Sequence, residues 1–113
     1  MEVVRFAEAP FYTLPGHDEV IARRLQGGEA SGAAFAMVGH SIFPPGSVVP
    51  MDAGPIGKIY FVTEGALIIE QNDGQRHVLE VSDSIYIAAG ESRAVRNDSG
   101  RPAAMLVVTP PPG

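Results

Sequence analysis

The chain has 113 residues, which is enough for one compact domain with one hydrophobic core and too short for two. Hydrophobic residues make up 45% of the sequence and charged residues 19%, a globular composition, and the net charge of −5 argues against a nucleic-acid or anionic-membrane surface. The sequence contains no cysteine, which excludes disulfides, a thiolate nucleophile and a cysteine-based zinc site.

No segment has the features of a targeting or membrane-spanning sequence. The chain lacks an apolar run of about 18 residues, and its N-terminus carries the acidic Glu2 in place of a signal peptide's apolar run. We therefore expect a cytoplasmic protein with a single domain over residues 1–113, in which residues 1–15 form an N-terminal arm.

Short apolar runs separated by turn residues predict an all-β fold of the sandwich or barrel kind. The best helical candidate, residues 17–26, can also be read as a strand that ends at Gly27 and Gly28. The remaining predicted strands cover residues 33–43, 58–65, 66–71, 76–81, 84–90, 93–97 and 103–110. Hairpin-like turns are predicted at residues 72–75, where Asp-Gly is a strong signal, and near 98–102.

Two spaced motifs lie within these strands and loops. The first consists of Gly46, Asp52, Gly54, Lys58 and Gly65, and it has the spacing of a metal-binding loop followed by a strand.

The second motif runs from Ser82 through Ala88, Gly90 and Arg93 to Asn97. Together the two spacings resemble those of a small single-domain cupin of the cupin-2, RmlC-like kind. The resemblance implies a double-stranded β-helix, or jelly-roll barrel.

In cupins, four positions of these motifs carry three histidines and a glutamate that hold iron, manganese, zinc or nickel. The corresponding residues here are Asp52, Gly54, Lys58 and Arg93. A divalent cation needs ligands with free lone pairs, and protonated lysine and arginine have none. We therefore expect no metal at the usual position and no other cofactor.

Strand alternation predicts which side chains share the barrel interior. If position 58 faces inward, as the corresponding residue of the family does, Tyr60 and Val62 also face inward, whereas Ile59 and Phe61 face outward. By the same argument Arg93 faces the interior.

Asp52, Lys58, Tyr60 and Arg93 would then line one pocket, which allows three interpretations. In the first, Lys58 and Arg93 bind a carboxylate or enolate while Asp52 or Tyr60 transfers a proton, as in a metal-free lyase, isomerase, epimerase or cyclase. In the second, the pocket binds a small molecule without turnover. In the third, the charged residues form an ion-pair network that fills a dead metal site and only stabilises the barrel.

The histidines and one methionine complete the candidate site. His40 either points into the barrel as a catalytic base or is hydrogen-bonded on the other face, because the parity of its strand is not fixed. An alternative metal site would consist of His40, Asp52 and one further ligand. His17 and His77 are predicted to be surface residues, and Met51 is predicted to form an adaptable, substrate-binding wall at the pocket entrance.

The resemblance also implies a homodimer, since small cupins often pair through strands and exchange terminal segments. The apolar segment 11–15 and strand 103–109 are the surfaces expected to form the dimer. The outward Ile59 and Phe61 are expected to be covered by the second sheet or by a partner. A small-molecule ligand is the other expected partner, and neither nucleic acid nor a membrane is expected.

Overall fold

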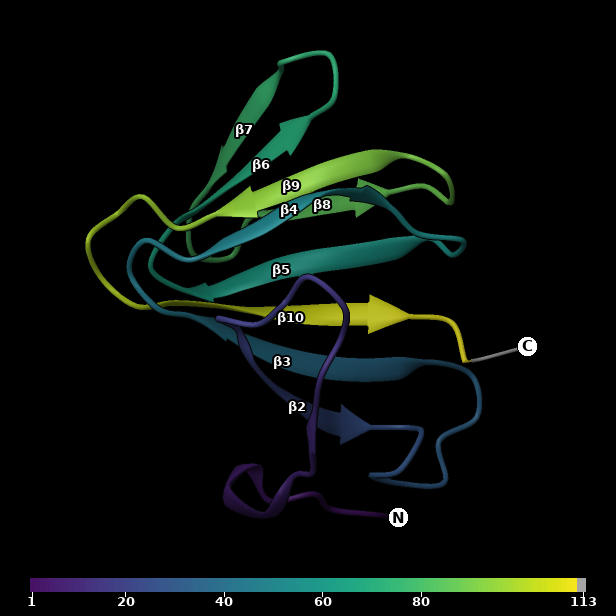
Figure 1. Cartoon of the computed structure of the whole chain (residues 1–113). Coiled ribbons are helices and arrows are strands. Elements are labelled where there is room, and N and C mark those ends of the chain that lie inside the picture. The colour runs from purple at the N-terminus through teal and green to yellow at the C-terminus, as the bar shows by residue number, and fades with distance from the viewer. Residues whose placement is uncertain (112–113) are drawn as a thin grey trace.

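A computed structural model describes residues 1–111 and consists of two facing antiparallel β-sheets and one short 3-10 helix (Figure 1). The elements are η1 (Phe6–Glu8), β1 (Phe11–Tyr12), β2 (Ile21–Gln26), β3 (Met37–Phe43), β4 (Val48–Ala53), β5 (Lys58–Glu64), β6 (Leu67–Gln71), β7 (Arg76–Leu79), β8 (Ser84–Ile87), β9 (Ser92–Arg96) and β10 (Ala103–Thr109). One sheet has the strand order β1-β2-β3-β10-β5-β8 and the other β4-β9-β6-β7. The all-β jelly-roll architecture predicted from the sequence is confirmed. Nowhere in residues 1–111 is a helix long and apolar enough to cross a membrane.

The predicted strand alternation is confirmed in β5. Tyr60 and Val62 are buried in the core, while Ile59 and Phe61 are exposed on the outer face of the six-stranded sheet. The buried cluster joins both sheets and consists of Phe43, Val49, Tyr60, Val62, Leu67, Ile69, Leu79, Ile87, Val95, Ala103 and Met105. The residue at position 58 therefore lies at the edge of this core, where the interior opens.

For residues 17–26, where the sequence left a helix and a strand open, the structure contains strand β2, which pairs with β3. Strand β4 was not predicted, since Pro50 interrupts its pattern. Proline is tolerated there because β4 is an edge strand whose pairing with β9 is irregular between Val49 and Asp52.

The turn at residues 72–75 is confirmed as the connection between the paired strands β6 and β7, and Gly74 N donates to Gln71 O across it. The segment 98–102 is not a hairpin, because it joins β9 to β10 in the other sheet. Buried Asn97 holds this crossing segment by donating from Nδ2 to Phe43 O at 2.8 Å and to Arg101 O at 2.7 Å.

The N-terminal segment runs along β2 and then across the barrel. Strand β1 pairs with β2, and Arg23 donates from Nη1 to Phe6 O at 2.8 Å while its guanidinium lies 4.0 Å from the Phe11 ring centroid. The segment between β1 and β2 crosses in front of β3 and β10 in Figure 1 and forms one wall of the interior.

Strand β10 lies between β3 and β5, and both of its edges are paired. It therefore has no free edge with which to pair with a strand of a second copy. This differs from the prediction that residues 103–109 form part of a homodimer surface.

Candidate functional site

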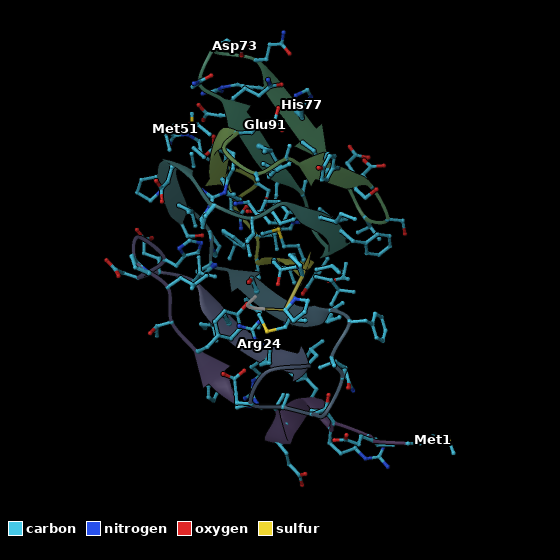
Figure 2. All side chains as sticks on the ribbon, turned by 90° about the vertical axis from the view of Figure 1, so that its right-hand side faces the viewer. Met1, Arg24, Met51, Asp73, His77 and Glu91 are labelled. Atoms are coloured by element: carbon cyan, nitrogen blue, oxygen red, sulfur yellow. The ribbon has the colours of Figure 1, made fainter. Side chains whose placement is uncertain are left out.

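A cavity of about 330 Å³ lies between the two sheets. It opens at the end of the barrel where β4 ends and β5 and β9 begin, at the right of Figure 1; Figure 2 faces this end. Asp52, Lys58, Tyr60 and Arg93 line it together, over an apolar floor that includes Met105. The structure thus brings together the four residues that strand alternation and motif spacing placed in one pocket.

The Arg93 guanidinium is fixed inside the barrel. Its Nε donates to the Tyr60 hydroxyl at 2.8 Å and its Nη1 to the backbone oxygen of Asp52 at 3.4 Å. Burial raises the pKa of Tyr60, and the charge of Arg93 only partly offsets that effect. Tyr60 therefore stays a neutral phenol that accepts a hydrogen bond from Arg93 and keeps its own proton to donate.

Lys58 lies half-buried beside this pair. A Cβ atom on Gly54 would be 3.2 Å from the Lys58 Nζ, so the missing side chain leaves room for the amine. Burial, followed by the charge of Arg93, lowers the pKa of Lys58, while Asp52 opposes the shift. Lys58 thus releases its proton more readily than an exposed lysine.

The ion-pair network of Asp52, Lys58 and Arg93, which was the third interpretation of the sequence, is not formed within residues 1–111. The Asp52 carboxylate accepts from the backbone nitrogen of Ala53 at 2.9 Å. Within residues 1–111 there are three ion pairs, and none of them includes Asp52, Lys58 or Arg93. The two cations therefore face an open cavity without a contacting carboxylate.

His17 also lines the cavity, although it was predicted to be a surface residue. Its Nδ1 donates to Pro15 O at 2.9 Å, so the neutral ring keeps a lone pair on Nε2. Burial lowers the pKa of His17, and the charges of Arg93 and Lys58 add to this effect, while the Pro15 bond and Asp52 oppose it. A neutral imidazole beside two cations is suited to accept a proton.

His40 and Met51 lie away from the cavity. His40 is on the outer face of β3, where its ring meets that of Phe6 edge-on at 4.9 Å between centroids. The inward residues of β3 are its neighbours Ser41 and Phe43, which do line the cavity. Met51 is 42% exposed on β4. Neither His40 nor Met51 is among the residues that line the cavity.

A second cavity of about 480 Å³ lies between the β6–β7 hairpin and β8. Figure 2 shows His77 and Glu91 beneath the hairpin tip at Asp73, and both residues line this cavity together with exposed Tyr86. Arg93 lines both cavities. Hydroxyl, amide and imidazole groups line the second cavity together with apolar side chains, and Glu91 is its carboxylate.

The side chains of the first cavity do not fit a divalent metal. No three histidine, aspartate or glutamate side chains within residues 1–111 lie close enough to hold one ion together. The cavity contains two possible ligands, the Asp52 carboxylate and the His17 imidazole. The cationic side chains of Lys58 and Arg93 line the same cavity and would repel a metal ion.

The family model described as "Cupin domain" matches residues 39–109. The chain belongs to the cupin family, which confirms the resemblance predicted from its two motifs. It is 36% identical over 112 residues, covering 99% of this chain and 96% of the relative, to a protein of Mycobacterium tuberculosis (strain ATCC 25618 / H37Rv) named beta-D-galactosidase.

Two solved structures share the fold. The polyketide cyclase RemF from Streptomyces resistomycificus superposes with a TM-score of 0.85 at 21% identity, covering 97% of this chain and 79% of that one. The DMSP lyase DddQ from Ruegeria pomeroyi DSS-3 gives a TM-score of 0.80 at 19% identity, covering 92% of this chain and 57% of that one.

Proposed function

We propose that the protein binds a small anionic or carbonyl-containing molecule in the first cavity and transfers protons on it without a metal, as a lyase, isomerase or cyclase does. One observation carries this proposal: Lys58 and Arg93 line the same cavity, and neither forms an ion pair within residues 1–111. Cations that share a partly buried site without a counter-ion favour the binding of a carboxylate or an enolate.

Each polar group has a role in this proposal. Arg93 holds the anionic group with the N–H groups that Tyr60 and the Asp52 backbone leave free, and Lys58 supplies a second charge. His17 or Asp52 removes a proton, and the neutral Tyr60 hydroxyl donates one to the developing oxyanion.

Titration calorimetry with small mono- and dicarboxylates tests the binding step. We expect saturable binding that weakens about tenfold or more in Lys58→Met, because a charge-assisted contact is lost. Arg76→Met is the matched control, since it removes a cation from an exposed part of β7, outside the cavity lining. Equal affinities in the wild type and both variants would contradict the proposal.

Proton transfer is distinguished from binding alone by isotope exchange. When ketoacids and ketones are incubated in D₂O, NMR should show faster loss of their α-protons with the wild type than with His17→Gln or Tyr60→Phe. If the ligands bind but their α-protons exchange only at the buffer rate, the protein is a non-catalytic binding cupin, which is the alternative to catalysis.

Hydrolysis of β-galactosides is a second candidate function. The observation that favours it is the 36% identity to the M. tuberculosis protein named beta-D-galactosidase. Glycosidases generally use two carboxyl groups on either side of the scissile bond, and the two cavities contribute Asp52 and Glu91. Release of nitrophenol from a nitrophenyl β-galactoside, lost in both Asp52→Asn and Glu91→Gln, supports this function; no release above the buffer rate rejects it.

We also propose that two copies pair through the outer face of β5 and β8. Ile59, Phe61 and Tyr86 are exposed there, and Ile59 is the ladder partner of Tyr86. A second copy offers the same patch, and a two-fold axis brings the two patches together. Light scattering should give a dimer mass for the wild type and a monomer mass for Phe61→Lys. A wild-type monomer at all concentrations would reject this pairing.

A further inference from the structure

We propose that the Lys58 amine attacks the carbonyl carbon of a bound aldehyde or ketone and forms a Schiff base with it. This inference deepens the proposed function and rests on it for the cavity in which the carbonyl compound binds. It adds a covalent step, and it narrows the substrate class to compounds with a free carbonyl group.

The position of Lys58 carries the inference. Lys58 is the chain's only lysine, and β5 places it at the boundary between the buried core and the open end of the cavity. Its Nζ lies next to Gly54, which has no side chain to crowd it, and it has no ion-pair partner within residues 1–111. The amine is thus confined within the site and open to a ligand.

The surroundings of Lys58 also favour the reactive form of the amine. Only a neutral amine is a nucleophile, and desolvation or an adjacent cation is the usual means of obtaining one. Burial and the charge of Arg93 both lower the pKa of Lys58. Arg93 cannot swing away, since Tyr60 and the backbone of Asp52 hold its guanidinium.

The step balances without an external oxidant or reductant. The lone pair of neutral Nζ forms a C–N bond, the carbonyl π electrons move to oxygen, and a proton passes from nitrogen to that oxygen. The hydroxyl of the carbinolamine then takes a second proton and leaves as water, and the nitrogen lone pair forms the C=N bond of a protonated imine. The Tyr60 hydroxyl and the His17 imidazole line the same cavity and can carry these protons.

A protonated imine withdraws electrons from the neighbouring carbon. Removal of an α-proton by His17 Nε2 or by Asp52 then gives an enamine, which can be reprotonated or can expel a leaving group from the β-carbon. Addition of water to the resulting imine releases the product and restores Lys58. The Schiff base thereby supplies the electron withdrawal that a metal ion gives in other sites.

Reductive trapping tests the inference directly. The folded protein is incubated with pyruvate or acetone and cyanoborohydride at about pH 7, and the peptide that contains Lys58 is quantified by mass spectrometry. We expect saturable alkylation of Lys58 about tenfold or more faster than in the urea-unfolded chain, because the folded site lowers the pKa of the amine. The exposed N-terminal amine of Met1 serves as an internal reference.

Two variants sharpen the test. Lys58→Arg keeps the charge and removes the nucleophile, so its peptide should carry no alkyl group. Gly54→Ala crowds Nζ without backbone strain, since Gly54 does not adopt a positive φ, and it should slow trapping. Alkylation of Lys58 at the unfolded rate, or without saturation, would overturn the inference.

The outcome is separable from that of the proposed function. Carboxylate binding that depends on Lys58, without trapping, rejects the Schiff base and leaves the anion site in place. Rapid trapping without carboxylate binding rejects the anion site and leaves the Schiff base in place.

Discussion

At the residue scale, the cavity depends on the contact between Arg93 and Tyr60. Both residues are buried, with exposed fractions of 7% and 3%. A buried guanidinium is costly unless its N–H groups find acceptors, and the phenol oxygen accepts from Nε. Since no carboxylate of residues 1–111 forms an ion pair with Arg93, this neutral acceptor keeps the cation in place without cancelling its charge.

Removing the Tyr60 hydroxyl should therefore destabilise the fold. We expect Tyr60→Phe to lower the free energy of unfolding by about 1–3 kcal/mol, because Arg93 Nε loses its acceptor inside the barrel. Urea denaturation measures this change. Tyr86→Phe is the matched control, since Tyr86 is exposed on β8 and should change stability by less than about 0.5 kcal/mol. Equal effects of the two substitutions would contradict the account.

His40 should make stability depend on pH, although it lies outside the cavity. Its buried Nδ1 has no hydrogen-bond partner within residues 1–111, and its ring contacts Phe6. Burial lowers the pKa of His40 below its ordinary value of 6.5, and Arg23 adds to this effect while Glu64 opposes it. The folded protein thus binds fewer protons than the unfolded chain once the pH falls below about 6.5.

We expect the free energy of unfolding to be highest above this pH and to decrease as the pH falls toward the lowered pKa of His40. Urea denaturation between neutral and mildly acidic pH measures the slope. His17 has a lowered pKa as well, so His40→Gln should flatten part of the slope and the double variant with His17→Gln should flatten more. A slope that is unchanged in His40→Gln would show that this residue does not govern it.

Among the cavity residues, Lys58, Tyr60 and Arg93 could be predicted from strand alternation and from the motif spacing. Lys58 and Tyr60 are two residues apart in β5, so their side chains face the same side of the sheet, and the inward direction of one predicts that of the other. His17 could not be found in this way, because it reaches the cavity from an irregular segment that crosses the barrel. His40 was ambiguous because β3 is at least half-buried on both faces, with the N-terminal segment covering its outer side.

At the scale of elements, the segment between β1 and β2 shapes one wall of the cavity. Tyr12, the last residue of β1, lies where this segment begins, with its ring against Gly39 of β3 and the Arg24 guanidinium 4.0 Å from its ring centroid. A Cβ atom at Gly39 would overlap the Tyr12 hydroxyl and would lie 3.3 Å from the ring carbon Cζ. The missing side chain at Gly39 is therefore what allows this wall to close.

Gly39→Ala should destabilise the protein by about 1–3 kcal/mol, because Tyr12 must leave its place on β3. The same substitution in the Tyr12→Phe background should cost less, since the hydroxyl that it meets is gone. A double-mutant cycle by urea denaturation measures the difference. If Gly39→Ala costs the same in both backgrounds, the contact with Tyr12 is not the reason for the glycine.

Prediction of the elements failed where tertiary context overrides local pattern. Strand β4 forms in spite of Pro50, because an edge strand with irregular pairing does not need every backbone N–H. The segment 98–102 has the residues of a hairpin turn, yet it crosses between sheets, held by the buried Asn97 side chain. Neither the strand at β4 nor the crossing of residues 98–102 can be predicted from the local residue pattern alone.

At the scale of the whole molecule, the hydrophobic core and the cavities share side chains. Phe43, Tyr60 and Met105 belong to the buried cluster and also line the first cavity. Ile69 and Ile87 belong to the same cluster and line the second cavity. The two motif spacings predicted the barrel architecture because they reflect the turns of the cupin barrel, which persist whatever side chains the ligand positions carry.

The most direct test of the account is the ionisation of Lys58, observed by NMR on protein labelled with ¹³C-lysine. As the chain's only lysine, Lys58 gives one Cε resonance. We expect its pKa to lie below the ordinary 10.5 in the free protein and to rise when a small carboxylate binds, since an anion stabilises the charged amine. A pKa at the ordinary value that no carboxylate shifts would contradict the claim that Lys58 and Arg93 form an uncompensated anion site.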